Sequence, residues 1–373
     1  MMNIVVQTLA GKDPIDLEVD PQSTLLELKR AVHNTDPHKF CGVSISLVFE
    51  EDALQEVDNY KSLASLGITD GTVLILVKKR ALILTSSKDH TAKMWNSTTG
   101  ECSTTFAGHS SEVVRASFSS DGSAVLTASR DKTAKLWNTM TGEVVQTFIG
   151  HGHAVVSAAL SPDATRVLTA SSDRTAKIWD AETGECGLTL NGHTDELQSA
   201  IFSKDGASIL TASNDHSARL WNASTGECTL TFTGHSHFVN TAIFSPDGAS
   251  VITACRDRTA KLWDASTAEC KQTFNGHSHY VMSAMLSADG FYLYTSASDT
   301  RVKVWSLASG ECVSTIPAHY ENVTAALVFN DGCTLLTASW DMTAKLWNTA
   351  TEECTQTFCG HTDFITSAAL FTD

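Results

Sequence analysis

Three residue types that can perform acid–base and nucleophilic chemistry recur together along most of this chain. A histidine, a threonine and an aspartate each return every 42 residues, and one such set consists of His109, Thr127 and Asp131. These groups can form a nucleophilic triad, in which the imidazole takes the hydroxyl proton and the carboxylate orients the imidazole. They can also form a repeated hydrogen-bond network, so the spacing admits a catalytic and a structural interpretation.

The repetition itself separates these two interpretations. The threonines are Thr85, Thr127, Thr169, Thr211, Thr253, Thr295 and Thr337; the aspartates are Asp89, Asp131, Asp173, Asp215, Asp257, Asp299 and Asp341; the histidines are His109, His151, His193, His235, His277, His319 and His361. Catalysis needs one site, whereas a scaffold needs the same support in every repeat. The position two residues before the aspartate, usually serine, also changes to Cys255 and Ala297. We therefore expect a structural role for these sets and a protein that is not an enzyme.

Three histidine pairs of the form His-x-His raise the question of a metal site. They are His151 with His153, His235 with His237, and His277 with His279. The first histidine of each pair already belongs to a repeated set, and no carboxylate or cysteine stands nearby at ligand spacing. The sequence therefore predicts neither a metal ion nor another cofactor.

A tryptophan follows each aspartate by six residues and marks the same 42-residue unit. The tryptophans are Trp95, Trp137, Trp179, Trp221, Trp263, Trp305 and Trp347. Within residues 112–150, apolar or alternating runs at 113–118, 124–129, 133–137 and 144–148 are separated by turn residues such as Asp-Gly and Thr-Gly. Such turns between β-branched runs are typical of hairpins, and four short strands leave no room for a helix. Each unit is therefore predicted to be a four-stranded antiparallel sheet.

These units resemble the WD-repeat family, which carries recurrent Gly-His and Trp-Asp signatures. Trp-Asp stands literally only at residues 179–180 and 263–264, with Asn or Ser after the other tryptophans. The resemblance implies a seven-bladed β-propeller in which a buried Thr-His-Asp-Trp network ties the turn after the second strand to the loop before the first. We call this network the brace. One brace consists of Thr127, His109, Asp131 and Trp137.

The seven units fill residues 81–373. The chain enters this region with a second strand at 81–86 and ends on a first strand at 364–370. The last blade should therefore be composite, with the C-terminal strand paired to strands within 81–107, which removes two open sheet edges. Residues 77–81 contain no Gly, Ser or Pro linker, so we expect the preceding segment to be held at a fixed angle.

The first 80 residues do not follow the repeat and form a separate predicted domain. Runs at 3–8 and 15–19 indicate a hairpin, Thr24 and Glu27 form a capping box before a helix, and later strands lie at 46–49 and 72–77. This order resembles ubiquitin. The expected fold class is therefore mainly β, with an α+β ubiquitin-like (β-grasp) domain at 1–80 and a seven-bladed WD-repeat β-propeller with one composite blade at 81–373.

The ubiquitin resemblance implies a docking patch on the first domain. The three apolar positions of ubiquitin's main docking surface align with Leu9, Val48 and Leu76, which are apolar here too. They indicate binding to ubiquitin receptors; the alternative is that Val48 and Leu76 pack against the propeller. Where ubiquitin ends in Gly-Gly, this chain continues through residues 77–80, so we do not expect conjugation to other proteins.

The composition favours an interaction protein. A net charge of −16 repels phosphate backbones, and no apolar stretch is long enough for a membrane span, so neither nucleic acid nor membrane is expected as a partner. Most of the ten cysteines fall at equivalent outer-strand positions on different blades, too far apart for disulfides. Free thiols indicate a reducing compartment, which we expect to be the cytoplasm, with the nucleus as the alternative.

The WD-repeat resemblance also locates exposed positions at one end of the propeller, which we call the brace face. They stand three and five residues after each brace histidine and one residue before each brace aspartate. The candidate partner-binding residues there are Phe238, Arg256, Tyr280, Met282, Trp340, Phe364, Lys88 and Arg130. Aromatic residues, Met and Arg are enriched in binding hot spots, so we expect a groove for an extended peptide with an apolar or cationic anchor against the rings. The alternative is that some rings fold inward and plug the channel.

The two predicted surfaces indicate a non-enzymatic adaptor for protein–protein interaction. In this hypothesis the propeller binds a protein or peptide partner, and the ubiquitin-like domain docks a ubiquitin receptor or another proteasome or ligase component. The alternative is a general assembly scaffold in which the ubiquitin-like domain is only a structural cap.

Overall fold

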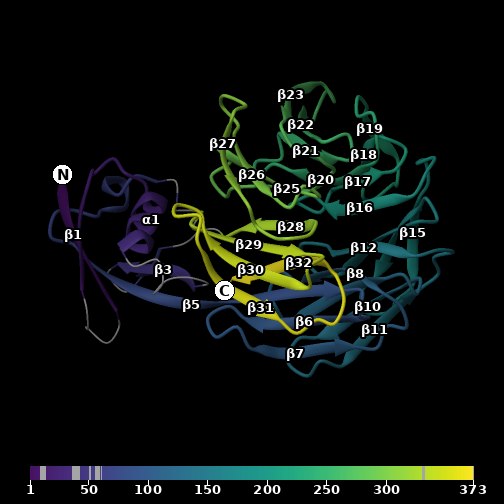
Figure 1. Ribbon diagram of the computed structural model, residues 1–373, viewed down its shortest axis with the longest axis horizontal. Coiled ribbons are helices and arrows are strands. Elements are labelled where there is room, and N and C mark those ends of the chain that lie inside the picture. The colour runs from purple at the N-terminus through teal and green to yellow at the C-terminus, as the bar shows by residue number, and fades with distance from the viewer. Residues whose placement is uncertain are drawn as a thin grey trace.

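The structure is a computed structural model that describes residues 1–8, 14–35, 43–49, 52–54, 59, 61–329 and 332–372. The N-terminal part lies to one side of a large array of sheets, and a long strand, β5 (Val73–Ser87), runs from one into the other (Figure 1). None of the helices in these ranges is long and apolar enough to cross a membrane.

The described residues of the larger part include six separate four-stranded antiparallel sheets. In chain order their strands are β8 (Val113–Phe118), β9 (Ala124–Ser129), β10 (Thr133–Asn138) and β11 (Val144–Ile149); β12 (Val155–Leu160), β13 (Arg166–Ser171), β14 (Ala176–Asp180) and β15 (Cys186–Leu190); β16 (Leu197–Phe202), β17 (Ser208–Ser213), β18 (Ala218–Asn222) and β19 (Cys228–Phe232); β20 (Val239–Phe244), β21 (Ser250–Cys255), β22 (Thr259–Asp264) and β23 (Cys270–Asn275); β24 (Val281–Leu286), β25 (Tyr292–Ala297), β26 (Val302–Ser306) and β27 (Cys312–Ile316); β28 (Val323–Val328), β29 (Thr334–Ser339), β30 (Thr343–Asn348) and β31 (Cys354–Cys359). These bounds follow the alternating runs of the sequence closely.

Local turn chemistry explains why each unit folds into hairpins. In the turn between β8 and β9, the Asp121 Oδ1 atom accepts hydrogen bonds from the Ser119 hydroxyl at 2.6 Å and from the Ser123 N–H at 3.0 Å. Gly122 between them has φ of +70°, a conformation that glycine adopts without steric cost. The turn thereby returns the chain antiparallel to β8.

The two ends of the repeat region are joined by strand pairing. The last strand, β32 (Ile365–Thr372), lies antiparallel to β5, with Ile365 opposite Ser87 and Thr372 opposite Ala81. On its other edge β5 pairs with β6 (Thr91–Asn96), which pairs with β7 (Cys102–Ala107). The C-terminal strand therefore completes a sheet whose other three strands lie near the start of the repeat region.

The first strands of the sheets form a closed ring. β8 contacts β12, and the contacts continue through β16, β20, β24 and β28 to β32, which contacts β8 again. We call these the innermost strands. Between successive sheets lie apolar clusters, such as the one that joins Trp179 to Phe148, Val155 and Leu126. Burial of these clusters against the next sheet holds the array together.

The N-terminal part is a mixed sheet covered by a helix. Its strands follow the order β2 (Ile15–Val19), β1 (Met2–Thr8), β5, β3 (Val43–Phe49) and β4 (Asp52–Ala53), and α1 (Leu25–Thr35) packs on it. A short 3₁₀ helix, η2 (Ala64–Leu66), precedes β5. The predicted capping box is confirmed, because the Thr24 N–H donates to Glu27 Oε2 at 2.7 Å and the Glu27 N–H donates to Thr24 Oγ1 at 3.3 Å.

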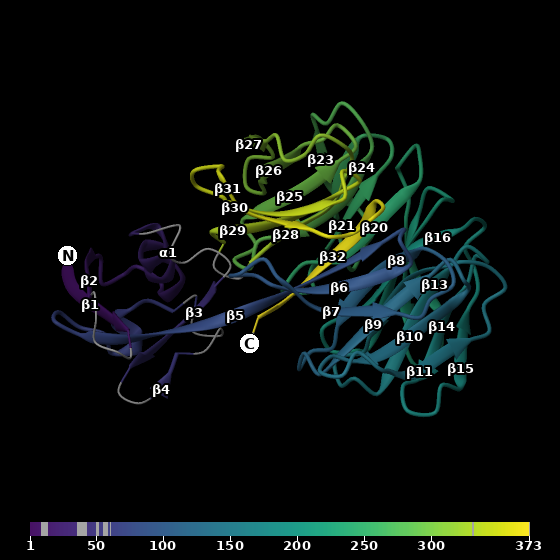
Figure 2. The same cartoon turned by 60° about the horizontal axis from the view of Figure 1, so that its bottom comes forward.

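The predicted boundary at residues 80 and 81 falls inside a strand. β5 pairs with β3 up to Arg80 and with β32 from Ala81 onward, so its pairing partner changes while the strand continues. No Gly or Pro interrupts the segment. Figure 2 shows β5 as one ribbon that passes from the N-terminal part into the array of sheets.

Helix α1 contacts the larger part directly. The Arg30 Nη2 atom lies 2.7 Å from Asp289 Oδ2, in the turn between β24 and β25. The Thr334 hydroxyl on β29 lies 3.4 Å from His33 Nε2. The continuous strand and these side-chain contacts hold the N-terminal part beside the ends of these strands that lie away from the brace face.

Candidate partner-binding face

The brace residues come together with the geometry of a catalytic triad but without access for a substrate. In one brace, His109 Nδ1 lies 2.7 Å from Asp131 Oδ2, and His109 Nε2 lies 2.7 Å from Thr127 Oγ1. The Trp137 Nε1–H group also donates to Thr127 Oγ1, at 2.8 Å. Thr127 is 0% exposed, so no substrate carbonyl can reach its oxygen in this structure. The arrangement joins β9 and β10 to the loop before β8.

Burial and hydrogen bonds set the charge states in the brace. Burial lowers the pKa of His109, although its bond to Asp131 opposes that shift. Burial alone would raise the pKa of Asp173, but hydrogen bonds from Thr175 and His151 outweigh burial and lower it to about 2. The stable form is therefore a neutral imidazole that donates to an ionised carboxylate.

The same bonds occur where the two ends of the repeat region meet. His361 Nδ1 lies 2.7 Å from Asp89 Oδ2 and His361 Nε2 lies 2.8 Å from Thr85 Oγ1, which also accepts from Trp95 Nε1–H at 2.7 Å. Residues separated by more than 270 positions thus form one brace. This brace adds side-chain bonds to the pairing of β5 with β32.

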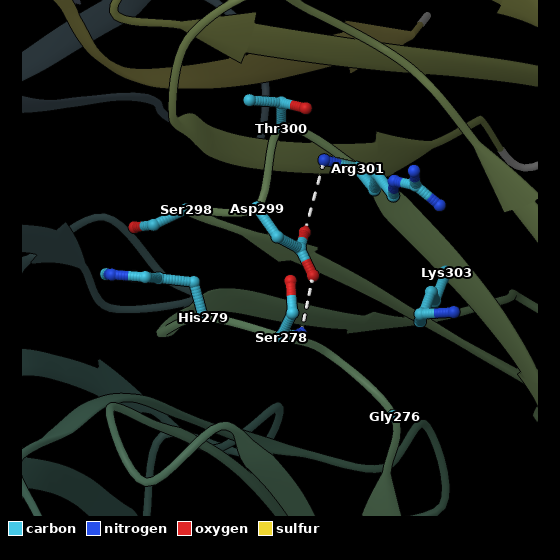
Figure 3. Close-up of a pocket in the computed structure, with 8 residues that line it drawn as sticks. All are labelled: Gly276, Ser278, His279, Ser298, Asp299, Thr300, Arg301 and Lys303. Atoms are coloured by element: carbon cyan, nitrogen blue, oxygen red, sulfur yellow. Dashed lines mark hydrogen bonds between the residues drawn. The ribbon is translucent and has the colours of Figure 1, made fainter.

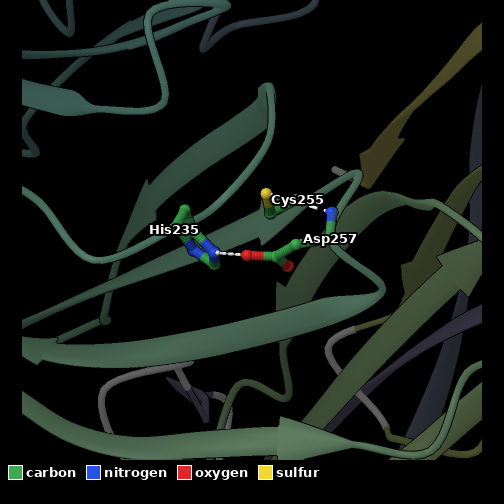
Figure 4. A group of neighbouring side chains, drawn as sticks. All are labelled: His235, Cys255 and Asp257. Carbon is green, nitrogen blue, oxygen red and sulfur yellow. Dashed lines mark hydrogen bonds and ion pairs between the residues drawn. The ribbon is translucent and has the colours of Figure 1, made fainter.

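Two brace side chains and a neighbouring cysteine are close enough together to suggest a metal site. They are His235, Cys255 and Asp257 (Figure 4). His235 Nδ1 lies 2.6 Å from Asp257 Oδ2, and the Cys255 thiol donates to the His237 carbonyl at 3.2 Å. Burial raises the pKa of Cys255, so it stays a neutral thiol, a poor metal ligand. These atoms are already engaged in the brace, and a metal ion would have to replace those bonds.

The candidate aromatic residues of the brace face form two separate groups, and the first surrounds Arg256. The Arg256 guanidinium lies 5.3 Å from the Phe238 ring centre and 5.9 Å from that of Tyr280. Its Nε–H group donates to Asn240 Oδ1 at 3.1 Å, and the Asn240 amide contacts the Met282 sulfur at 3.8 Å. These residues come from the ends of β20, β21 and β24, and we call them the Arg256 cluster.

The second group surrounds Lys88. The Trp340 and Phe364 rings stack with centres 5.2 Å apart and planes within 5° of parallel. The Lys88 ammonium lies 5.5 Å from the Trp340 ring centre and 5.2 Å from that of Phe364. We call these three residues the Lys88 cluster. All three side chains are partly exposed.

The structure adds two features to this face. We expect the rings to receive an apolar or cationic anchor from the partner, and Arg256 and Lys88 of the protein itself already lie against them. Another candidate, Arg130, lies apart from both clusters: it is exposed on another sheet and pairs with Glu112, with Arg130 Nε 2.9 Å from Glu112 Oε2. The ring of sheets separates side chains that a shared repeat position suggests are together.

Histidines that were considered only as metal ligands join the Arg256 cluster instead. The His237 ring centre lies 4.6 Å from that of Phe238 and 5.7 Å from that of Tyr280. The His279 ring centre lies 4.3 Å from that of Tyr280. Their position, two residues after a brace histidine, was the signal that could have placed them on the brace face.

A shallow cleft lies beside this cluster, above one brace (Figure 3). It is lined by Gly276, Ser278, His279, Ser298, Asp299, Thr300, Arg301 and Lys303. Asp299 accepts from the Ser278 N–H at 2.9 Å and from the Arg301 N–H at 3.3 Å. Other braces have Thr or Ser where this one has Arg301, so this aspartate lacks the side-chain hydroxyl bond that Asp257 receives from Thr259 at 2.7 Å.

The candidate docking patch of the N-terminal part differs from the one predicted from the sequence. Leu9 lies outside the described residues. Leu76 is 3% exposed and belongs to the core under α1, so it is not a docking residue. Strand alternation explains this, because Leu76 pairs with the buried Leu47, whereas the partly exposed Val48 pairs with Ile75 on the other face of the sheet.

Comparison with known protein families agrees with the fold. The repeated four-stranded sheets and their braces define a WD-repeat β-propeller, and residues 100–138 match the family model described as WD domain, G-beta repeat. Residues 154–373, more than half of the chain, match the model described as IFT122 first beta-propeller, and the chain belongs to this family. No curated protein sequence matches the chain. WD-repeat propellers generally mediate protein–protein interaction and are generally non-enzymatic scaffolds.

Proposed function

We propose that the protein is a non-enzymatic adaptor that holds two protein partners at fixed positions. Residues 81–373 act as a seven-bladed propeller with one composite blade, and its brace face captures a protein or peptide. Residues 1–80 act as a ubiquitin-like domain that docks a component of the ubiquitin–proteasome system, such as a ubiquitin receptor. The free thiols of the described cysteines fit a reducing compartment, and we assign the protein to the cytoplasm.

The observation that carries the proposal is the pair of aromatic clusters on the brace face. Phe238, Tyr280, Trp340 and Phe364 remain partly exposed, although each packs against a cation or another ring. Clustered aromatic side chains beside Arg and Met have the composition of interface hot spots. Their exposure also argues against rings that fold inward as a plug.

The two surfaces lie at opposite ends of the same strands. Tyr280 immediately precedes β24, at the brace face, whereas Asp289 follows the other end of β24 and binds Arg30 of helix α1. A partner on the brace face therefore leaves the N-terminal part accessible. This geometry supports a bridge between two partners.

The N-terminal part offers an exposed apolar surface on the sheet face away from α1. Val73 is 48% exposed and Ile75 is 37% exposed, and Val48 lies opposite Ile75 on β3. Helix α1 carries the contacts with Asp289 and Thr334 described above, and the sheet face is left for another protein. The second candidate function, a general scaffold with this part as a cap, is favoured by those same contacts and by the continuous β5.

Capture from lysate with matched point variants tests the proposal. Deletion of residues 1–80 is unsuitable because it cuts β5 and removes the contacts of α1. The variants are Phe238→Ala/Tyr280→Ala/Trp340→Ala for the brace face and Val48→Asp/Ile75→Asp for the N-terminal sheet. The control is Val145→Asp, an exposed position on an outer strand.

The adaptor predicts three outcomes. Each double or triple variant loses its own set of partners, the control loses none, and the set lost with Val48→Asp/Ile75→Asp contains ubiquitin receptors, proteasome subunits or ligase subunits. If that variant loses no partner, the N-terminal part is a cap and the scaffold function replaces the adaptor.

A further inference from the structure

One innermost strand carries a cation that the other innermost strands lack. Arg115, on β8, stands six residues after the brace histidine His109. The equivalent residues on the other innermost strands are Ser157, Ser199, Thr241, Ser283, Ala325 and Ser367. Within the described ranges, Arg115 makes one side-chain hydrogen bond, from Nη1 to Ser157 Oγ at 3.3 Å, and no ion pair. A single guanidinium thus lies in a ring of small neutral residues.

Such a cation is costly without an anion. Burial lowers the pKa of Arg115, yet a guanidinium remains protonated in proteins, so the charge cannot be removed by deprotonation. The neutral hydroxyl of Ser157 compensates a buried charge only weakly. The side chain is nevertheless partly exposed, so a ligand can reach it.

An unsatisfied hydroxyl lies in the same ring of residues. Thr241 Oγ1 is buried, and no hydrogen-bond partner is found for it among the residues that the structure describes. A hydroxyl and a guanidinium can both donate to the oxygen atoms of a carboxylate. As far as the described residues go, this ring holds a guanidinium without an anionic partner and a hydroxyl donor without an acceptor.

Two further cations stand at the same end of the propeller without a carboxylate partner in the described part of the chain. Lys88 and Arg256 each directly follow a second strand, and Arg115 pairs with Ala128 close to the equivalent end of β9. Arg130 at the same type of position is neutralised by Glu112. Lys88 and Arg256 still have N–H groups that can bind a ligand. An aromatic ring attracts a cation but does not neutralise its charge as a carboxylate does.

The charges of this face differ from those of the whole protein. The chain carries a net charge of −16, yet Lys88, Arg115 and Arg256 form no ion pair with a carboxylate among the residues that the structure describes. Acidic residues are present on the face: Asp195, Glu196, Glu321 and Asp363. Asp195 and Asp363 each use Oδ1 to accept the N–H of the next residue, at 2.8 and 2.7 Å, and so cap their own loops. These two carboxylates are partly engaged by their own loops, while Lys88 and Arg256 at the aromatic clusters present positive charge to a ligand.

We propose that the partner segment bound at the brace face is acidic: one carboxylate binds Arg115 among the innermost strands, and others bind Arg256 and Lys88 at the aromatic clusters. This inference rests on the proposed function, since it names the chemistry of the partner that the propeller captures. The rings hold the two outer cations in place, and apolar side chains of the same segment pack beside them.

Fluorescence anisotropy of a labelled poly-glutamate peptide tests the inference on the full-length protein, with a poly-glutamine peptide of equal length as the neutral comparison. The variants are Arg115→Met and Lys88→Met/Arg256→Met. The control is Lys271→Met, which removes the same charge at the opposite end of the sheet, where Lys271 pairs with Asp264 at 2.8 Å.

We expect the poly-glutamate peptide to bind and the poly-glutamine peptide not to bind. Arg115→Met should weaken binding roughly tenfold, the loss of one ionic contact, while Lys271→Met leaves it unchanged. Binding should weaken as salt rises. The melting temperature of Arg115→Met should be unchanged or higher, because removal of a partly buried charge that forms no ion pair among the described residues does not destabilise the fold.

Three results would overturn the inference: equal binding of both peptides, unchanged binding by Arg115→Met, or a markedly lower melting temperature for Arg115→Met. Competition with inorganic phosphate tests whether the site instead binds small oxyanions. Complete displacement of the peptide by a low phosphate concentration would show such a site and also overturn the inference. Failure of the adaptor itself is distinguishable. If lysate partners are lost in the Phe238, Tyr280 and Trp340 variant while poly-glutamate does not bind, the adaptor stands and the acidic partner is wrong.

Discussion

The buried braces and the exposed brace face lie next to each other along the chain, yet they vary in opposite ways. Each aspartate of a brace is followed six residues later by its tryptophan in all seven units, and the distances within the braces agree closely. The residue immediately before that aspartate is lysine, arginine, serine, asparagine or tryptophan. A buried hydrogen-bond network restricts residue types because unsatisfied donors are costly, whereas partly exposed positions are free to differ. The comparison shows that the residues repeated in every unit stabilise the fold, whereas the residues that differ between units are available for recognition.

Acid should act on all braces together and give the largest effect. The pKa of His109, His151, His319 and His361 is lowered by burial, so the unfolded chain binds protons first and stability falls as the pH drops below about 6.5. The pKa of Asp173 is lowered to about 2, so its contribution is present above 3.8 and is lost between 3.8 and about 2. Both groups act in the same direction.

The melting temperature followed by circular dichroism should therefore be level above neutral pH and fall continuously in acid. A melting temperature that stays level as the pH falls through about 6.5, where free histidine titrates, would contradict the lowered pKa of these four histidines.

Disruption of one brace should reduce the stability of the fold less than acid does, but more than a substitution on the surface does. Asp131→Ala leaves the His109 ring and the Ser110 and Thr133 N–H groups without their acceptor. We expect a loss of about 1–3 kcal/mol in the free energy of unfolding, measured by urea titration, for each donor that stays buried. Partner capture at moderate temperature should persist. If capture is lost together with the fold, the brace and the brace face do not have separate roles in stability and in binding.

Restoration of a missing hydroxyl should give a smaller effect of opposite sign. Arg301→Thr supplies the side chain that donates to the aspartate in other braces, as Thr259 does to Asp257 at 2.7 Å. One added hydrogen bond should raise the free energy of unfolding by about 0.5–1.5 kcal/mol. Lys204→Thr, which replaces an exposed cation in the turn after β16, away from the brace face, serves as the control. A decrease in stability would show that Arg301 has a role of its own in the cleft.

The smallest change in stability is expected on the brace face. Trp340→Ala removes a partly exposed ring that stacks on Phe364 and lies near Lys88. We expect a change of less than about 1 kcal/mol in the free energy of unfolding, but loss of partner capture. Calorimetry and lysate capture on the same preparation measure both. A loss of several kcal/mol would place this ring in the core and favour a plug.

Several features of the site could be predicted because they repeat. His109, Thr127, Asp131 and Trp137 form the network that the spacing indicates, and the strand bounds follow the alternating runs. The pairing of Lys88 with Trp340 and Phe364 could not be predicted in this way. These side chains come from distant parts of the chain that meet only when β32 lies on β5.

In the N-terminal part, the sequence also could not predict which individual side chains are exposed. Residues 73–77 are an uninterrupted apolar run, which predicts a strand but not which face is buried. The register that pairs Leu76 with Leu47 decides that Leu76 lies in the core and Ile75 outside it.

The sequence by itself determined the period, the strand positions, the capping box of α1 and the composition of each brace, because these depend on contacts within one repeated unit. Only the tertiary structure decided that β5 is continuous, that Arg30 binds Asp289, and that Arg115 has no carboxylate partner among the described residues. Those properties depend on which distant side chains are brought together when the ring of sheets closes. The 42-residue period of the sequence does not predict which side chains from distant units become neighbours.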